Sequence, residues 1–186
     1  MAKRHHSPGK RGYRCVDAAT LEKEVSYILQ EFGSETVFIG SIAMMAHTER
    51  GRRTKDIDVI LPHECTAMLI ERGFTTDKKG AWYGPHGVKV DFYTRGEKIG
   101  GIPVEDIERD AQTKKWNDYE IRVPKLEHMM LMKMVATERS KPADVREAHK
   151  SDLRTLAIEH TKRNDIDWKY AEHYRSNFKR RLEELI

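Results

Sequence analysis

The sequence contains little cysteine and no long apolar run. Only two cysteines occur in 186 residues, Cys15 and Cys65, and they form no Cys-x-x-Cys pair. This spacing disfavours both a disulfide scaffold and a cysteine zinc site. No apolar run reaches the roughly 18 residues of a membrane-spanning helix, and the N-terminus lacks the apolar segment of a secretory signal. We therefore expect a reduced, cytoplasmic protein with no membrane partner.

Charged residues are abundant. They make up 34% of the chain, against a typical share of about 25%. The 34 Lys and Arg residues outnumber the 30 Asp and Glu residues, which gives a formal net charge of +4 and a pI near 9.0. A basic balance favours polyanionic partners in general but identifies none.

The pattern along the chain predicts three segments. Residues 1–14 carry five Lys or Arg and no acid, which is typical of a basic flexible arm. Residues 15–123 alternate between strand and helix patterns, and residues 124–186, beginning at Pro124, are helical throughout. The predicted fold class is α+β: a small mixed β-sheet with flanking helices, followed by a C-terminal helical segment.

The expected elements follow from hydrophobic spacing and from turn residues. In the segment from Asp17 to Phe32 the apolar residues recur at intervals of three and four, with Asp17 as N-cap and Gly33 as the stop. Further helices are predicted over 42–47, 64–72, 104–112, 125–139, 143–161 and 168–185. Strands are predicted over 36–39, 55–61, 88–94 and 119–123.

Three aspartates lie within the predicted strands. Asp56 and Asp58 are separated by one residue on an otherwise apolar strand, so their side chains share one face, with Cα atoms about 6.5–7 Å apart. Asp91 repeats this setting on a later strand. Three carboxylates with oxygen ligands suit Mg²⁺ or Mn²⁺, and such a set can hold two metals for phosphoryl displacement. The alternative is that they are solvated or paired with Arg52, Arg53 and Lys55.

A small-residue turn precedes the acidic strand. Gly40-Ser41 lies between a predicted strand and a predicted helix, where backbone N–H groups and the helix dipole favour a phosphate. Gly-Ser is also a common turn, and the pair is informative only because a helix and the acidic strand follow it.

These motifs, in this order, resemble nucleotidyltransferases of the polymerase-β type. The signature is a hydrophobic residue before Gly-Ser, then Asp-x-Asp, then a third acid on a later strand. The segment Arg52-x-Thr54-x-Asp56-x-Asp58 resembles more closely the branch of AbiEii-type toxins and minimal nucleotidyltransferases. The helical half resembles this branch more loosely, through Lys133-x-x-Ala and Arg139. The Lys-Asp segment of the branch has two imperfect counterparts, Lys141–Asp144 and Lys150–Asp152.

The resemblance implies a nucleotidyltransferase fold and an Mg²⁺-dependent transfer of a nucleoside monophosphate from an NTP to a hydroxyl, with release of pyrophosphate. It implies that Asp56, Asp58 and Asp91 are the catalytic metal ligands. The implied nucleotide-binding residues are Gly40, Ser41, Arg52, Thr54 and Lys133.

Other functions and acceptors remain open. The basic arm and the cluster between Arg50 and Lys55 favour an alternative: a toxin or antitoxin partner, or a nucleic-acid-binding module, that has the fold but no transfer activity. A metal-dependent nuclease or phosphatase would use the same carboxylates. The acceptor of a transfer is a tRNA end, a protein side chain or a small molecule.

Overall fold

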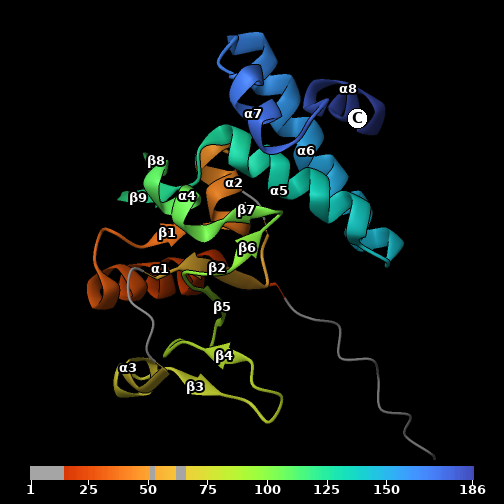
Figure 1. Ribbon diagram of the computed structural model, residues 1–186. Helices are drawn as coiled ribbons and strands as arrows, with labels where there is room; N and C mark the ends of the chain where they lie inside the picture. The colour runs from red at the N-terminus through yellow and green to blue at the C-terminus, as the bar shows by residue number, and fades with distance from the viewer. Residues whose placement is uncertain (1–14, 51–52, 62–65) are drawn as a thin grey trace, which may run out of the picture.

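The computed structural model describes residues 15–50, 53–61 and 66–186 (Figure 1). Within them, seven strands form one sheet in the order β3-β4-β5-β2-β1-β9-β8. The strand bounds are β1 Val37–Phe38, β2 Asp56–Ile60, β3 Thr75–Thr76, β4 Trp82–Tyr83, β5 Lys89–Tyr93, β8 Gln112–Trp116 and β9 Tyr119–Val123. A separate hairpin pairs β6 Lys98–Ile99 with β7 Ile102–Pro103.

Within the described residues, four helices lie between or before the strands up to residue 123, and the other four follow one another after it. Their bounds are α1 Ala18–Phe32, α2 Gly40–Thr48, α3 Thr66–Glu71, α4 Val104–Arg109, α5 Leu126–Arg139, α6 Ala143–Arg163, α7 Trp168–Tyr174 and α8 Phe178–Leu185. The Asp17 carboxylate caps α1 by accepting from the Thr20 N–H at 2.9 Å, and Gly33 ends the helix with φ +82°. Both caps are those that the sequence predicts.

The sheet is mixed, and its two faces differ. β2 pairs in parallel with β5, and β1 with β9, while the other pairings are antiparallel. Helix α1 covers the apolar face, where the Phe32 ring lies 6.5 Å from that of Phe92. Because side chains alternate along a strand, Asp56, Asp58 and Asp91 lie on the opposite face.

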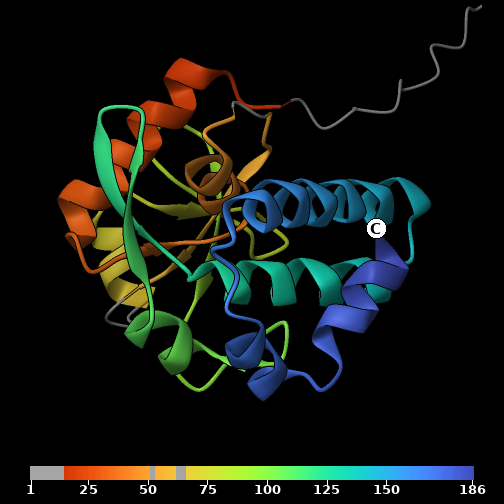
Figure 2. The same cartoon turned by 90° about the horizontal axis from the view of Figure 1, so that it is seen from above.

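The C-terminal helices pack together and against α2. Figures 1 and 2 show α5 and α6 side by side. Helix α7 contacts the start of α5 through Tyr170 and His128, whereas α8 reaches the end of α5, where Arg181 pairs with Glu138. Met129, Met130 and Met134 of α5 are fully buried, so they contribute to the packing of the core. In the part of the chain that the structure describes, no helix has both the length and the apolar character that a membrane-spanning helix requires.

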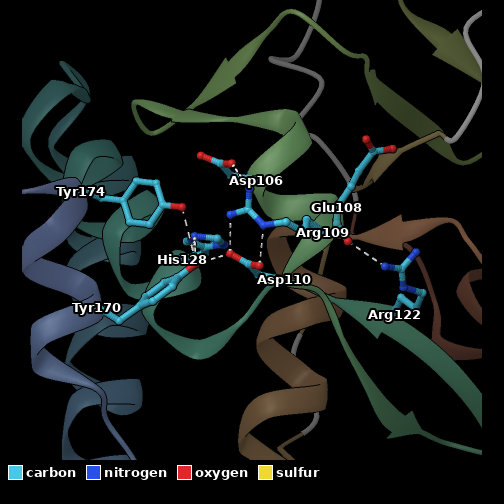
Figure 3. A network of polar contacts seen from close by, with 8 residues as sticks. All are labelled: Asp106, Glu108, Arg109, Asp110, Arg122, His128, Tyr170 and Tyr174. Atoms are coloured by element: carbon cyan, nitrogen blue, oxygen red, sulfur yellow. Dashed lines mark hydrogen bonds and ion pairs between the residues drawn. The ribbon is translucent and has the colours of Figure 1, made fainter.

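A polar network joins α7 to the sheet-bearing part of the chain (Figure 3). The Tyr170 hydroxyl donates to Asp110, just after α4, and contacts His128 Nε2 on α5 at 2.9 Å. Arg109 holds the same Asp110 carboxylate with two hydrogen bonds of 2.9 Å each. Burial lowers the pKa of His128 to about 4, so this network contains a neutral imidazole at pH 7.

The predicted fold class is confirmed, and three details need correction. The helix predicted over 104–112 ends at Arg109, and Gln112–Trp116 forms strand β8 because it pairs with β9. The helix predicted over 168–185 is divided into α7 and α8, because Asn177 takes a left-handed conformation with φ +59°. The two-residue strands β3, β4, β6 and β7 were not predicted, since they are too short to show alternation. The predicted arm, residues 1–14, lies outside the described residues.

Candidate active site

The register between β2 and β5 brings the three aspartates together. Asp58 lies directly opposite Asp91 in this parallel pair, and Asp56 precedes Asp58 by two residues on the same face. The side chains of Asp56 and Asp91 are each 37% exposed, so solvent reaches them. The predicted grouping of carboxylates on one accessible face is therefore present in the structure.

The Gly40-Ser41 turn lies against the same carboxylates. The Ile39 N–H donates to the Asp58 carbonyl oxygen at 2.9 Å, which holds the turn beside β2. Gly40 then begins α2 with φ +58°, and a Cβ atom at this position would lie 2.0 Å from Asp58 Oδ2. Only glycine allows the start of α2 to approach the carboxylate this closely. Ser41 is half-buried in the first turn of α2.

Substitution of Gly40 by alanine tests this close approach. We expect Gly40→Ala to cost about 1–3 kcal/mol of unfolding free energy, because alanine is strained at a positive φ and its Cβ displaces the Asp58 carboxylate. Chemical denaturation measures this loss. Gly87→Ala is the control, because Gly87 also has a positive φ but has open space around it. Equal losses for the two variants would contradict a specific contact with Asp58.

The carboxylate cluster has an excess of negative charge. Burial, followed by the charges of Asp56 and Asp91, raises the pKa of Asp58 to about 7. Lys133 and Lys89 act in the opposite direction but do not offset these effects. Burial, and then the charge of Asp58, also raises the pKa of Tyr93 to about 12. A bound cation on this face would relieve the repulsion.

Lys89 already holds one of the three carboxylates. Its Nζ lies 2.7 and 2.5 Å from the two oxygens of Asp91 and 4.0 Å from Asp56 Oδ2. Burial acts against the ammonium charge, but the hydrogen bond and charge of Asp91 outweigh it and raise the pKa of Lys89. Lys89 therefore stays protonated and competes with any metal for Asp91.

The residue types fit a hard divalent cation, and the side-chain positions fit it less well. Three carboxylates on one face supply the oxygen donors that Mg²⁺ and Mn²⁺ prefer. Within the part of the chain that the structure describes, no group of three His, Cys, Asp or Glu side chains is arranged to hold a metal ion. Asp56 and Asp58 are the carboxylates that remain for a cation, because Asp91 is hydrogen-bonded to the Lys89 ammonium.

Lys133 reaches this face from α5. It is buried, its charge acts on Asp58, and its Nζ donates to Asp152 Oδ2 on α6 at 2.7 Å. The predicted Lys133 thus lies near the carboxylates, but as half of an ion pair between two helices. Its partner Asp152 belongs to the second of the two imperfect Lys-Asp segments.

The two remaining predicted residues lie at the edge of the site. Thr54 is buried, and its hydroxyl donates to the Asp56 carbonyl oxygen at 2.9 Å, so it shapes the start of β2. Arg52 lies outside the described residues. Lys89 is the main residue that sequence reasoning missed, although its i, i+2 spacing from Asp91 places both on one face of a strand.

Comparison with known proteins identifies the fold. No family model and no curated protein matches the sequence. An antigenic nucleotidyltransferase-like protein from Paracoccidioides brasiliensis matches with a TM-score of 0.56 and 11% identity, over 91% of this chain and 95% of that chain.

The antibiotic-resistance factor ANT(2″)-Ia matches in two structures. The crystal structure in complex with adenylyl-2″-tobramycin gives a TM-score of 0.58 at 15% identity, over 87% of this chain and 97% of that chain. The solution structure gives a TM-score of 0.59 at 15% identity, over 90% of this chain and 93% of that chain. These likenesses concern the fold alone, and they show that this chain has the nucleotidyltransferase fold: a mixed sheet with C-terminal helices.

Proposed function

We propose that the protein is an Mg²⁺-dependent nucleotidyltransferase that moves a nucleoside monophosphate from an NTP to a hydroxyl acceptor. The observation that carries this proposal is the juxtaposition of Gly40 with Asp58, on the face that Asp56 and Asp91 share. A turn that binds phosphate beside carboxylates of excess negative charge suits a metal-bound triphosphate.

Each group has a role that its position supports. Asp56 and Asp58 would hold Mg²⁺ or Mn²⁺, with Asp91 as a further ligand; the bound ion would stabilise negative charge on the triphosphate. Gly40 and Ser41 contact its terminal phosphates through backbone N–H groups and a hydroxyl. Lys133 adds positive charge on the α5 side.

Asp91 is the candidate base. Once Lys89 shifts away, its carboxylate accepts the proton of the acceptor hydroxyl. The acceptor oxygen then forms a bond to the α-phosphorus in line, the bond to the β-phosphate oxygen breaks, and pyrophosphate leaves with the electron pair. The segment from Arg52 to Asp58 supports a closer relation to the AbiEii-type branch, and the acceptor is a tRNA end, a protein side chain or a small molecule.

One observation favours a second candidate function. The Lys89 ammonium already neutralises Asp91, so a protein of this fold that binds nucleotide or nucleic acid, or acts as a toxin or antitoxin partner, without transfer is also consistent with the site. Incubation with an NTP labelled at the α-phosphate, together with candidate acceptors, separates the two: label on an acceptor shows transfer, and label that stays on the NTP favours the function without transfer. Free labelled monophosphate would instead show hydrolysis.

Calorimetric titration with each NTP and Mg²⁺ tests the site itself. We expect the wild type to bind at least one NTP and the variant Asp56→Asn/Asp58→Asn to lose at least about tenfold in affinity, because the metal-binding charge is removed. The control Asp118→Asn/Asp144→Asn makes the same charge change at exposed positions. Absence of binding by the wild type, or equal affinities of the two variants, would contradict the proposal.

A further inference from the structure

A polar cavity lies away from the carboxylates. It measures about 480 Å³ and is lined by the C-terminal end of α2, the β8–β9 hairpin and the last residue of α6. The two sites lie at opposite ends of helix α2: Gly40, at its start, lies beside Asp58, and the cavity lies at its C-terminal end. Nine residues with a rise of 1.5 Å each make this helix about 14 Å long. The cavity is therefore distinct from the proposed triphosphate site.

The lining of this cavity is strongly basic. Arg50, Lys114, Lys115 and Arg163 surround it, and Glu49 is the one acidic residue among the lining residues that the structure describes. We call this set of four cations and their cavity the basic pocket. Burial lowers the pKa of His47, which also lines it, to about 4, so this imidazole adds no charge at pH 7.

Most of this positive charge has no ion-pair partner in the part of the chain that the structure describes. Arg50 pairs with Glu159, but Lys114, Lys115 and Arg163 form no ion pair within residues 15–50, 53–61 and 66–186. Other arginines of the chain do have carboxylate partners; examples are Arg72, Arg109, Arg122, Arg175 and Arg181.

The ends of the helices account for only part of this cluster. The partial negative charge at a helix C-terminus, about half a unit, favours Arg50 after α2 and Arg163 in the last turn of α6. It cannot offset Lys114 and Lys115 as well, which lie on a strand. Three elements far apart in sequence thus bring together positive charge that an external anion would neutralise.

We propose that the basic pocket binds phosphate groups, with the backbone of a nucleic-acid strand as the ligand that fits it best. The cavity is far larger than one phosphate and falls in the usual size range of ligand pockets, about 300–1,000 Å³. Arginine forks and lysine ammonium groups are the usual donors to phosphate oxygens. Trp116 is 6% exposed and its ring stacks on Tyr119, so it offers little surface to a base. Binding therefore reads the backbone rather than the sequence.

The test uses the full chain and a fluorescently labelled single-stranded RNA of twelve uridines, with anisotropy measured from 50 to 300 mM KCl. The variant Lys114→Gln/Lys115→Gln/Arg163→Gln removes three charges of the pocket. We expect it to bind at least about tenfold more weakly at 100 mM KCl, and the slope of log affinity against log salt to fall by about 2, as three lost phosphate contacts predict.

The matched control is Lys23→Gln/Lys78→Gln/Lys79→Gln. It makes the same change in net charge at exposed positions on α1 and in the β3–β4 turn, and both variants keep the basic segment 1–14. Unchanged circular dichroism spectra verify folding. Equal losses in the two variants, or a wild type that binds neither the RNA nor tripolyphosphate, would overturn the proposal.

Two further arms identify the source of the phosphate and separate this site from the proposed function. In the first arm, the wild type binds tripolyphosphate but not the RNA, and the pocket variant no longer binds tripolyphosphate. This result would identify free polyphosphate as the ligand and would support phosphate binding in the basic pocket. The variant Asp56→Asn/Asp58→Asn should bind RNA at least as well as the wild type. Loss of RNA binding in that variant would place the contact at the carboxylate face and overturn the proposal.

Discussion

Replacing Asp152 by alanine is expected to lower the free energy of unfolding by about 3–5 kcal/mol. The carboxylate is the partner of the buried Lys133 ammonium at 2.7 Å, and the two side chains are 11% and 9% exposed. Removal of one member leaves a charge with little access to water, and the desolvation cost of that charge is then uncompensated. Urea denaturation followed by circular dichroism measures the change.

Two variants sharpen this prediction. In Lys133→Met/Asp152→Leu both charges are gone, so most of the lost stability should return. Glu184→Ala breaks the exposed pair with Arg180 and should cost less than about 1 kcal/mol. A loss for Asp152→Ala as small as that for Glu184→Ala would show that the helix pair does not depend on this contact.

The second large effect is a dependence of stability on pH that originates at Asp58. Burial and the charges of Asp56 and Asp91 raise the pKa of Asp58 from 3.8 to about 7 in the folded protein. Because the folded state binds the proton more tightly, this contribution is fully present below pH 3.8 and is lost as the pH rises through 7. The total loss is about 4 kcal/mol, of which about 2.5 kcal/mol falls between pH 5 and pH 8.

Comparison with Asp58→Asn isolates this effect from the other titrating groups. The stability of the variant relative to the wild type should increase by about 2.5 kcal/mol from pH 5 to pH 8, since asparagine does not ionise. Denaturation curves at the two pH values give this difference. Asp144→Asn, at an exposed position on α6, should follow the wild type at both. Parallel behaviour of Asp58→Asn and the wild type would mean that Asp58 ionises normally.

The same charge balance connects stability with the proposed activity. Asp58 destabilises the folded protein when ionised, and its carboxylate lies in close contact with Gly40. A local loss of stability of this kind is typical of functional sites, where a bound ligand supplies the opposite charge that the protein lacks. The positive charges of Lys133 and Lys89 reduce this cost, and Lys89 also holds Asp91.

Local sequence pattern was sufficient for elements with a clear period and for the identity of the acidic residues. The three-four spacing in Asp17–Phe32 and the alternation in Lys89–Tyr93 are properties of neighbouring residues, so helix α1 and strand β5 were predictable. The order of Gly40, Asp58 and Asp91 likewise indicated a phosphate turn and a carboxylate face. The two-residue strands β3, β4, β6 and β7 were not predictable, because they exist only where a partner strand pairs with them.

Tertiary structure decided which charges meet. The pairing of Lys133 with Asp152, the hold of Lys89 on Asp91 and the grouping of Lys114 with Arg163 depend on how helices and strands pack, and no local spacing specifies that packing. The pKa of Asp58 is likewise a property of its buried surroundings. Electrostatic energy depends on distance in space and on burial, so a linear sequence shows which charges are present, and only the folded chain shows which of them are compensated.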